Sequence, residues 1–361
     1  MMPSLARRHR PKRLADLVGQ DALVQTLTAG LAKGQTAQAY VLTGIRGVGK
    51  TTTARIIARA LNCEQGPTAD PCGVCDSCRA LDAESHPALI EIDAASQSGV
   101  DAMRGLLEQL PYVPMMGRAK VVVIDEAHGL SRAAWDALLK TLEEPPPHVV
   151  FVFATTEARK IPATILSRCQ TFALKRIAPA EVEARLAAVC QADEIPVAPG
   201  ALQAIALAGE GSMRDALTLL DQARLRADGA EITPALVAEM LGTAGIADVL
   251  ALAERVLARD ARGTLDVLRR VRAQGALAEP LAQDLAQAAV LCAETALDAA
   301  APAALPPKAQ ETARAIAKTY GPAGATALYA AMAKAIPDLR ESHDPDAALE
   351  MALLRLAWSN V

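Results

Sequence analysis

Gly44-Ile45-Arg46-Gly47-Val48-Gly49-Lys50-Thr51 is the most informative stretch of this 361-residue chain. It fits the pattern G-x-x-x-x-G-K-[ST] of a phosphate-binding loop. The apolar run at residues 39–43 predicts a strand before it, and residues 52–61 predict a helix after it. A glycine turn that matched the pattern by chance would not be expected between a strand and a helix. Glycines let backbone N–H groups converge on phosphate oxygens, so we expect a nucleoside triphosphate, with Lys50 on its β- and γ-phosphates and the Thr51 hydroxyl on Mg²⁺.

The composition of the chain excludes some functions. The net charge is −4, so no overall basic field indicates nucleic acid, and any DNA contact must be local or made by an assembly. No run of about 18 apolar residues occurs, and the N-terminus has no apolar signal core. We therefore expect a cytoplasmic protein without a membrane segment, whose length allows two or three domains.

Four of the seven cysteines lie within 16 residues, with the spacing C-x8-C-x2-C-x2-C; they are Cys63, Cys72, Cys75 and Cys78. Disulfides are rare in the cytoplasm, so bound metal or reduced thiols are expected. Four thiolates fill every position around a tetrahedral Zn²⁺ ion, which predicts a structural zinc site in an insert at residues 63–78. An iron–sulfur cluster and plain reduced thiols remain the alternatives.

Further apolar runs predict four more strands, at residues 88–93, 120–124, 149–153 and 170–174. Helical patterns separate these runs. The sequence therefore predicts an α/β domain with a parallel five-stranded sheet and its functional groups at the carboxyl ends of the strands.

Asp125-Glu126 follows the third of these strands. In a nucleotide hydrolase, Asp125 would hold the Mg²⁺ shell and Glu126 would polarise the attacking water. With His128 the segment also spells Asp-Glu-Ala-His, as in a class of helicases. Thr155 follows the next strand, beside the carboxylate pair. Its hydroxyl could sense the γ-phosphate or hold the water, or it could be a plain strand-end threonine.

Two regions flank this predicted sheet. The basic N-terminal segment at residues 7–13 has two interpretations. It could be a solvated arm or a nonspecific contact for anions, or it could wrap around the nucleotide. From about residue 179 only helical patterns follow, first at residues 179–192, 199–208 and 212–226. The later segments begin near residues 246, 260, 279, 306, 322 and 344. Arg214 falls in the first turn of the helix predicted at 212–226. A cation is unfavourable there, which indicates a partner, either the neighbouring Asp215 or something else.

Several motifs together carry a family resemblance. They are Arg10-Pro11 before Val18-Gly19-Gln20, the phosphate-binding loop, the four-cysteine insert, Asp125-Glu126, Leu138-Leu139-Lys140-Thr141-Leu142-Glu143-Glu144-Pro145-Pro146, Ala154-Thr155-Thr156, Ser167-Arg168-Cys169 and Gly211-Ser212-Met213-Arg214-Asp215. Along essentially its whole length, the chain resembles the bacterial DNA polymerase III gamma/tau subunit family, the ATPase of the clamp loader.

The resemblance implies an AAA+ nucleotide-binding domain at residues 1–178, a small helical lid at 179–242 and an all-α collar for oligomerisation at 243–361. It implies ATP, Mg²⁺ and Zn²⁺ as cofactors, with Thr51 and Asp125 on magnesium. Arg168 would be an arginine finger on a neighbouring subunit's ATP, Arg214 the lid arginine and Thr155 the sensor, acting with Lys50, Asp125 and Glu126. The implied nucleotide-binding residues are Arg10, Pro11, Val18, Gly19, Gly44, Arg46, Gly47, Val48, Gly49, Lys50, Thr51, Thr52 and Arg214.

The same resemblance implies partners and a function. The chain would form a five-subunit ring with delta, delta-prime and copies of itself, and would use ATP to open the sliding clamp and load it onto primer–template DNA without reading sequence. A non-hydrolysing scaffold like delta-prime is one alternative, although it would need a degraded loop, and Lys50 and Thr51 are intact. A nucleic-acid helicase is the other, against which the four-cysteine insert and the Arg214 motif argue.

Overall fold

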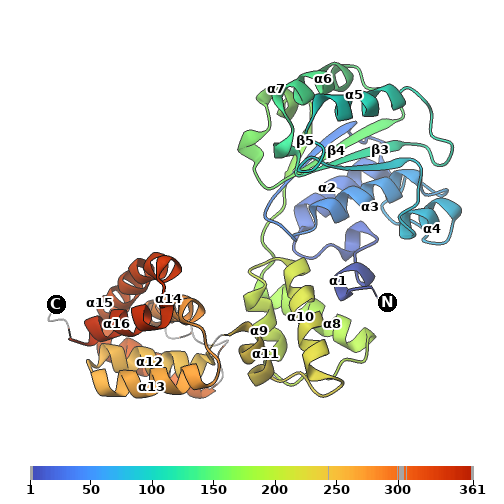
Figure 1. Cartoon of the computed structure of the whole chain (residues 1–361). Helices are drawn as coiled ribbons and strands as arrows, with labels where there is room; N and C mark the ends of the chain where they lie inside the picture. Colours follow the sequence, from blue (N-terminus) through green and yellow to red (C-terminus); the bar gives the residue numbers. More distant parts are fainter. Residues whose placement is uncertain (1–2, 243, 299, 301–304, 306, 359–361) are drawn as a thin grey trace. The chain divides into compact units, whose positions relative to one another are not determined.

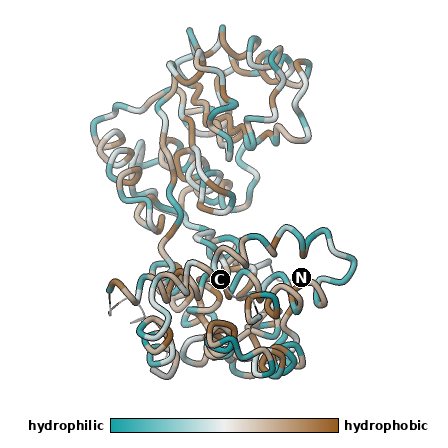
Figure 2. Tube along the Cα trace, turned by 90° about the vertical axis from the view of Figure 1, so that its left-hand side faces the viewer, coloured by the Kyte–Doolittle hydropathy of each residue, from teal (hydrophilic) through white to brown (hydrophobic). Residues whose placement is uncertain are grey.

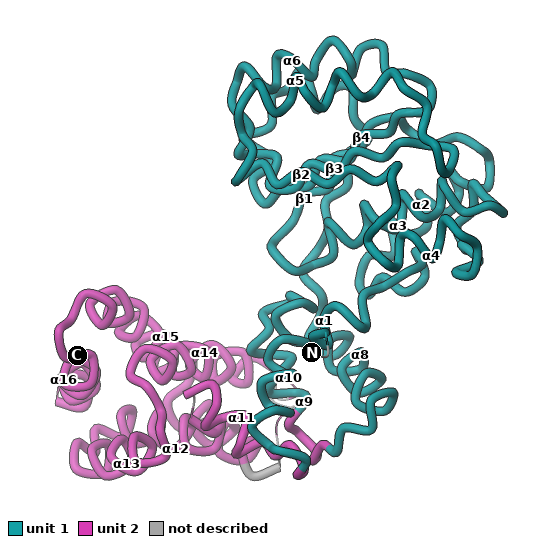
Figure 3. Tube along the Cα trace, turned by 45° about the vertical axis from the view of Figure 1, so that its right-hand side comes forward, with its two compact units in different colours: residues 1–196, 202–229 teal, residues 197–201, 230–361 magenta. Residues whose placement is uncertain are grey.

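The computed structural model describes residues 3–242, 244–298, 300, 305 and 307–358 (Figure 1). The chain divides into two compact units. The first comprises residues 1–196 and 202–229, and the second comprises residues 197–201 and 230–361 (Figure 3). The predicted domain boundaries after residues 178 and 242 remain predictions, and Thr243 itself lies outside the described residues.

A parallel five-stranded sheet forms the centre of the first unit, as the sequence predicts. The strands are β1 (Ala39–Thr43), β2 (Leu89–Asp93), β3 (Lys120–Asp125), β4 (Val149–Thr155) and β5 (Gln170–Ala173). They lie in the order β2-β3-β4-β1-β5, and every pair is parallel. Valine, isoleucine and phenylalanine dominate β3 and β4, as expected for central strands that are buried on both faces.

Helices cover both faces of this sheet (Figure 1). Val121 and Val123 of β3 pack in the core on the side of α2 and α3, whereas Val122 and Ile124 pack in the core on the side of α5 and α6. This alternation follows from the two-residue period of a strand. Hydrophobic and hydrophilic stretches alternate along the chain, as the colours of Figure 2 show. The covering helices are α2 (Asp21–Ala32) and α3 (Lys50–Asn62) on one face and α5 (Val100–Gln109), α6 (Arg132–Glu143) and α7 (Ala163–Leu166) on the other.

The strand register brings polar side chains to one edge of the sheet. Thr43 of β1 lies opposite Thr155 of β4, and Asp93 of β2 lies opposite Asp125 of β3. The loop at residues 44–51 leaves β1 at this edge. Because ligands of open α/β sheets bind outside the carboxyl ends of the strands, this edge is where a site is expected.

The first unit also contains shorter elements and three of the predicted helices. The sequence did not predict α1, α4 or the 3₁₀ turns η1, η2 and η3, which are too short to show a helical period. The predicted helices near 179–192, 199–208 and 212–226 are present as α8, α9 and α10. The bounds are α1 (Leu5–Arg8), η1 (Leu14–Asp16), α4 (Asp76–Asp82), η2 (Ala127–Gly129), η3 (Ala158–Lys160), α8 (Pro179–Ala192), α9 (Ala201–Ala208) and α10 (Met213–Ala227).

The second unit consists mainly of helices in its described residues. Its helices are α11 (Pro234–Leu241), α12 (Ile246–Leu257), α13 (Ala261–Ala273), α14 (Ala278–Leu297), α15 (Pro307–Glu341) and α16 (Pro345–Trp358). Gly321 interrupts α15 with φ 60° and ψ −169°, so a new helix begins at Pro322 as predicted, while the start predicted at Pro306 lies outside the described residues. Within the described ranges no single helix is long and apolar enough to cross a membrane. The bent pair α11 and α12 has the required length and apolar composition only when the two helices are taken together.

Candidate nucleotide-binding site

The glycines of the loop between β1 and α3 have backbone conformations that other residues rarely adopt. Gly44, Gly47 and Gly49 have φ values of 141°, 77° and 107°. A Cβ atom at Gly47 would lie 1.9 Å from Ser212 Oγ, directly before α10. Glycine at position 47 therefore lets the loop approach the start of α10 as closely as it does.

Lys50 begins α3 and is turned onto its own loop. Its Nζ donates hydrogen bonds to the carbonyl oxygens of Gly44 and Ile45, each at 2.9 Å. Burial lowers the pKa of the Lys50 ammonium, while Glu126 and Asp125 oppose that shift. A phosphate oxygen would give the ammonium a stronger, charge-assisted partner than a neutral carbonyl does, so the residue is placed to accept one.

The carboxylate pair lies across from this lysine. Thr51 Oγ1 donates to Asp125 Oδ2 at 2.7 Å, and Asp125 Oδ1 accepts the Glu126 backbone N–H at 2.9 Å. Glu126 has φ 46°, and its carboxylate accepts a bond from Thr156 Oγ1 at 3.3 Å. A hydroxyl oxygen and a carboxylate oxygen are ligands that Mg²⁺ prefers, so Thr51 and Asp125 fit a magnesium ion.

Thr155 does not open onto the site. It is fully buried, and its hydroxyl oxygen accepts the Glu157 backbone N–H and lies 3.0 Å from His128 Nδ1. The same Nδ1 is 3.4 Å from Glu126 Oε2, and His128 Nε2 is 3.5 Å from Glu157 Oε1. Thr155 therefore reaches Glu126 through the imidazole of His128, a contact that the sequence did not predict.

An open cavity of ≈ 630 Å³ connects these groups. This volume is within the range of about 300–1,000 Å³ that is usual for ligand pockets. Arg7, Asp93 and Arg185 also line it, although the sequence singled out none of them individually. Four residues predicted for nucleotide binding or catalysis are not among its lining residues: Gly19, Gly44, Thr155 and Arg168. The predicted residues that line it are Arg10, Pro11, Val18, Arg46, Gly47, Val48, Gly49, Lys50, Thr51, Thr52, Asp125, Glu126 and Arg214.

The cavity is rich in positive charge. Lys50 and five arginines line it, and within the described part of the chain neither Arg46 nor Arg214 forms an ion pair with a carboxylate. The Arg214 backbone N–H donates to the Gly47 carbonyl at 3.3 Å, so the first turn of α10 touches the phosphate-binding loop. Unpaired guanidinium groups beside the N-terminus of α3 favour an anionic ligand.

Arg168 lies apart from this cavity, after α7. Its guanidinium donates to Glu143 Oε1 at 2.6 Å and to the Thr164 carbonyl at 2.7 Å. Its side chain is about one-third exposed, with a relative accessibility of 35%. A role for Arg168 in nucleotide chemistry would therefore require a nucleotide held by another chain.

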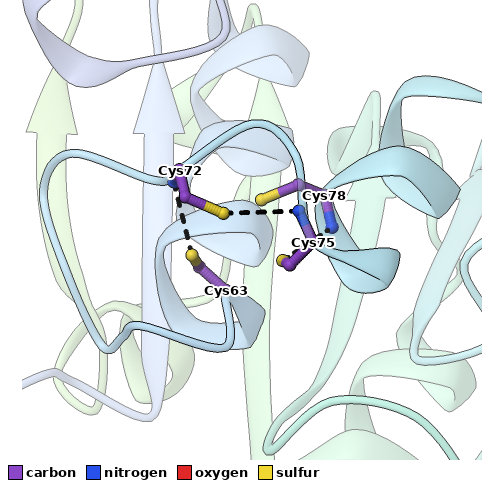
Figure 4. Close-up of side chains that lie close together, drawn as sticks. All are labelled: Cys63, Cys72, Cys75 and Cys78. Carbon is purple, nitrogen blue, oxygen red and sulfur yellow. Dashed lines mark hydrogen bonds between the residues drawn. The ribbon is translucent and has the colours of Figure 1, made fainter.

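The four cysteines of the insert converge, as the sequence predicts (Figure 4). Their Sγ atoms all lie within 4.8 Å of one another. Backbone N–H groups donate to three of the sulfurs at 3.4 Å. The N–H groups of Val74 and Cys75 lower the pKa of the Cys72 thiol to about 6, whereas burial raises the pKa of Cys78 to about 12. Four converging sulfurs with N–H donors fit a tetrahedral zinc ion and leave no open position for catalysis.

The sheet order, the phosphate-binding loop, the carboxylate pair and the helices that follow define an AAA+ ATPase fold. Three family models match consecutive parts of the chain: "DNA polymerase III, delta subunit" at residues 19–178, "DNA polymerase III clamp loader subunit, ATPase lid domain" at 181–229, and "DNA polymerase III subunits gamma and tau domain III" at 232–360. The DNA polymerase III subunit gamma of Buchnera aphidicola is 40% identical over 271 residues, which are 75% of each chain. The chain belongs to the DNA polymerase III gamma/tau family.

Two further comparisons define the extent of this similarity. The DNA polymerase III subunit tau of Escherichia coli is 42% identical over 351 residues, which are 97% of this chain and 54% of that protein, so the chain spans about half the length of this relative. Among solved structures, the Holliday junction branch migration motor RuvB of Thermotoga maritima has a TM-score of 0.49 and 20% identity, covering 64% of this chain and 72% of that chain. At this level the structural likeness says nothing about function.

Proposed function

We propose that the first unit binds ATP with Mg²⁺ and hydrolyses it. The observation that carries this proposal is the convergence of the phosphate-binding loop, Asp125, Glu126 and Arg214 on one cavity. The backbone N–H groups of the loop and the N-terminus of α3 would hold the phosphates. The surrounding guanidinium groups would balance their charge.

The proposed chemistry assigns a task to each group. Glu126 would accept a hydrogen bond from a water molecule and orient it in line with the γ-phosphorus. As the water oxygen bonds to phosphorus, the bond to the β,γ-bridging oxygen breaks, and ADP and phosphate leave. Lys50 and Arg214 would stabilise the charge on the transferring group. Mg²⁺, held through Thr51 and Asp125, would neutralise charge on the β- and γ-phosphates.

Membership of the family extends the proposal to clamp loading in the cytoplasm. The chain would assemble with delta, delta-prime and copies of itself in a five-subunit ring, and Arg168 would act on the ATP of a neighbouring subunit. ATP would favour the clamp-opening form of the ring only by binding that form more tightly than the relaxed one. Primer–template DNA would be held through its phosphates, and a zinc ion in the insert would be structural.

A reconstituted complex with clamp and primed DNA tests this function. In Lys50→Ala and Glu126→Gln variants we expect ATP turnover to fall by at least about 10²-fold, and clamp loading to fail with it. Lys33→Ala changes an exposed lysine outside the cavity and serves as the matched control, with turnover unchanged. Normal clamp loading by Lys50→Ala would instead support a non-hydrolysing scaffold, and ATP-dependent strand unwinding by the purified chain would support a helicase.

A further inference from the structure

An N-terminal strap, defined here as residues 5–13, lies along the nucleotide cavity. Arg7, Arg10 and Pro11 of the strap are lining residues of the cavity. Because the strap has only a four-residue helix and a 3₁₀ turn after it, its own secondary structure cannot fix these side chains. The groups that hold the strap from outside therefore determine where Arg7 and Arg10 lie.

The helices α8 and α10 hold the first part of the strap. Leu5 is fully buried, and its backbone N–H donates to Asp221 Oδ2 at 3.0 Å. Arg8 and His9 both contact the Asp193 carboxylate, His9 at 3.1 Å. Arg7 and Arg10 take no part in these contacts. They pair instead with a carboxylate that follows the four-cysteine insert in the chain.

That carboxylate is Glu84. Its Oε2 accepts from Arg7 at 2.7 Å, and its Oε1 accepts from Arg10 at 3.3 Å and from Arg55 at 2.5 Å. The hydrogen bond from Arg55 is the main reason that the pKa of Glu84 is lowered. Burial is the main reason that the pKa of Arg10 is lowered, and the positive charges of Arg55 and Arg214 lower it further. Glu91 also pairs with Arg55, at 2.6 Å, so Glu84 is the carboxylate that Arg7 and Arg10 share, and without it these two guanidinium groups would lose their ion pairs beside the cavity.

The position of Glu84 depends on the cysteine cluster. Glu84 follows α4, which is capped at its start by the Cys75 sulfur and contains Cys78. Ser77 on the same helix bonds to His86 Nε2 at 2.9 Å, and His86 Nδ1 accepts the Ala88 backbone N–H at the entrance to β2. The start of the helix that precedes Glu84 is thus fixed by two of the four sulfurs and by the bond between Ser77 and the buried His86.

We propose that Glu84 is a positioning residue for the nucleotide cavity, and that the four-cysteine insert acts through it as the anchor of the N-terminal strap. Metal bound by the cysteines is then coupled to nucleotide affinity, although no cysteine lines the cavity. This inference rests on the proposed function of the cavity as an ATP site. It gives the insert a task at that site rather than a separate structural role.

Glu84 has φ 54°, a conformation that favours glycine, and this allows a structural role to be separated from a positioning role. Glu84→Gly removes the carboxylate but suits the backbone, so its midpoint of thermal unfolding should equal or exceed that of Glu84→Gln. Calorimetric titration with ATP and Mg²⁺ should nevertheless show both variants binding ATP about threefold to tenfold more weakly than wild type, as expected for loss of a few ion pairs.

Asp70→Asn is the matched control. Asp70 lies within the insert and, like Glu84, pairs with the strap, through Arg13 at 3.2 Å, but Arg13 does not line the cavity. The ATP affinity of Asp70→Asn should stay within about twofold of wild type, because an exposed ion pair away from the cavity contributes little to binding. Wild-type affinity in both Glu84 variants would overturn the inference. Failure of the wild-type chain to bind ATP would overturn the proposed function itself.

Metal removal tests the second half of the inference. Chelation of the zinc-loaded protein should weaken ATP binding by wild type and by Asp70→Asn to about the level of Glu84→Gln. In Glu84→Gln, which has already lost the connection, chelation should change the affinity by less than about twofold. Equal further losses in all three proteins would contradict transmission through Glu84. If chelation unfolds the unit, as circular dichroism would reveal, the Glu84 variants alone decide.

Discussion

His128 connects three groups at the edge of the nucleotide cavity. Its Nδ1 faces both the Thr155 hydroxyl and the Glu126 carboxylate, and its Nε2 faces Glu157. If Glu126 orients the attacking water, the imidazole that contacts its carboxylate sets the direction in which that carboxylate points. His128 is therefore expected to position Glu126 without touching the nucleotide, since it is not among the residues that line the cavity.

Replacing this histidine should affect turnover more than binding. A hydrogen bond to a charged group is worth about 1.5–3 kcal/mol, which is about 10–100-fold in rate. We expect His128→Ala to lower kcat of the assembled complex by that factor and to leave the Kd for ATP unchanged. His128→Asn, whose amide nitrogen can occupy the place of Nδ1, should recover more activity than His128→Gln, whose amide reaches the place of Nε2.

Glu157→Gln provides the control for this prediction. Glu157 is about half exposed and contacts only the Nε2 side of the ring, so its loss should leave kcat within about twofold of wild type. A similar loss in His128→Ala and Glu157→Gln would show that the ring is needed for packing alone. A weaker Kd for ATP in His128→Ala would place the ring at the nucleotide and contradict its indirect role.

Single side chains also show what spacing along the sequence can establish. The sequence predicted that Asp125 and Thr155 would come to one edge of the sheet, and the strand register places them there. It could not establish which hydroxyl faces Glu126, because successive residues of a strand point to opposite sides. Thr156, one residue further, is the threonine that bonds Glu126 directly.

Among the secondary-structure elements, the strands were the most predictable and α1 and α4 the least. Runs such as 121–124 are apolar and β-branched, so local composition already specifies a buried strand. The helix α4 has seven residues, and its start is capped by the Cys75 sulfur rather than by a serine, threonine, aspartate or asparagine. Likewise α1 exists because Leu5 is buried against another helix, a tertiary contact that no local pattern records.

The cysteine insert should depend on a metal for its stability. We expect elemental analysis of the purified chain to give about one zinc per chain, because four thiolates fill a tetrahedral site. Cys63→Ser should abolish this zinc and lower the midpoint of thermal unfolding by at least about 2–4 °C, the shift that corresponds to each lost kcal/mol in a unit of this size. Cys169→Ser, which lies outside the cluster, should keep the zinc. Bound iron, or no metal in the purified chain, would contradict the assignment.

For the chain as a whole, the proposal that the nucleotide site is shared between subunits depends on Arg168. The predicted finger lies outside the cavity that contains Lys50, and its guanidinium is held by Glu143 and the Thr164 carbonyl. We therefore expect Arg168→Ala to bind ATP with unchanged affinity as an isolated chain. In the assembled ring its ATP turnover should fall by about 10³-fold or more, the usual effect of removing an arginine finger.

A mixing experiment distinguishes action between subunits from a general loss of assembly. A ring assembled from Arg168→Ala and Lys50→Ala chains can contain an interface where an intact Lys50 meets an intact Arg168, so it should regain part of the turnover that each variant lacks alone. Arg159→Ala, which changes a nearby exposed arginine, should behave as wild type in both assays. Weaker ATP binding by the isolated Arg168→Ala chain, or no recovery in mixed rings of normal size, would mean that Arg168 acts within its own subunit, and the site would then be complete in one chain.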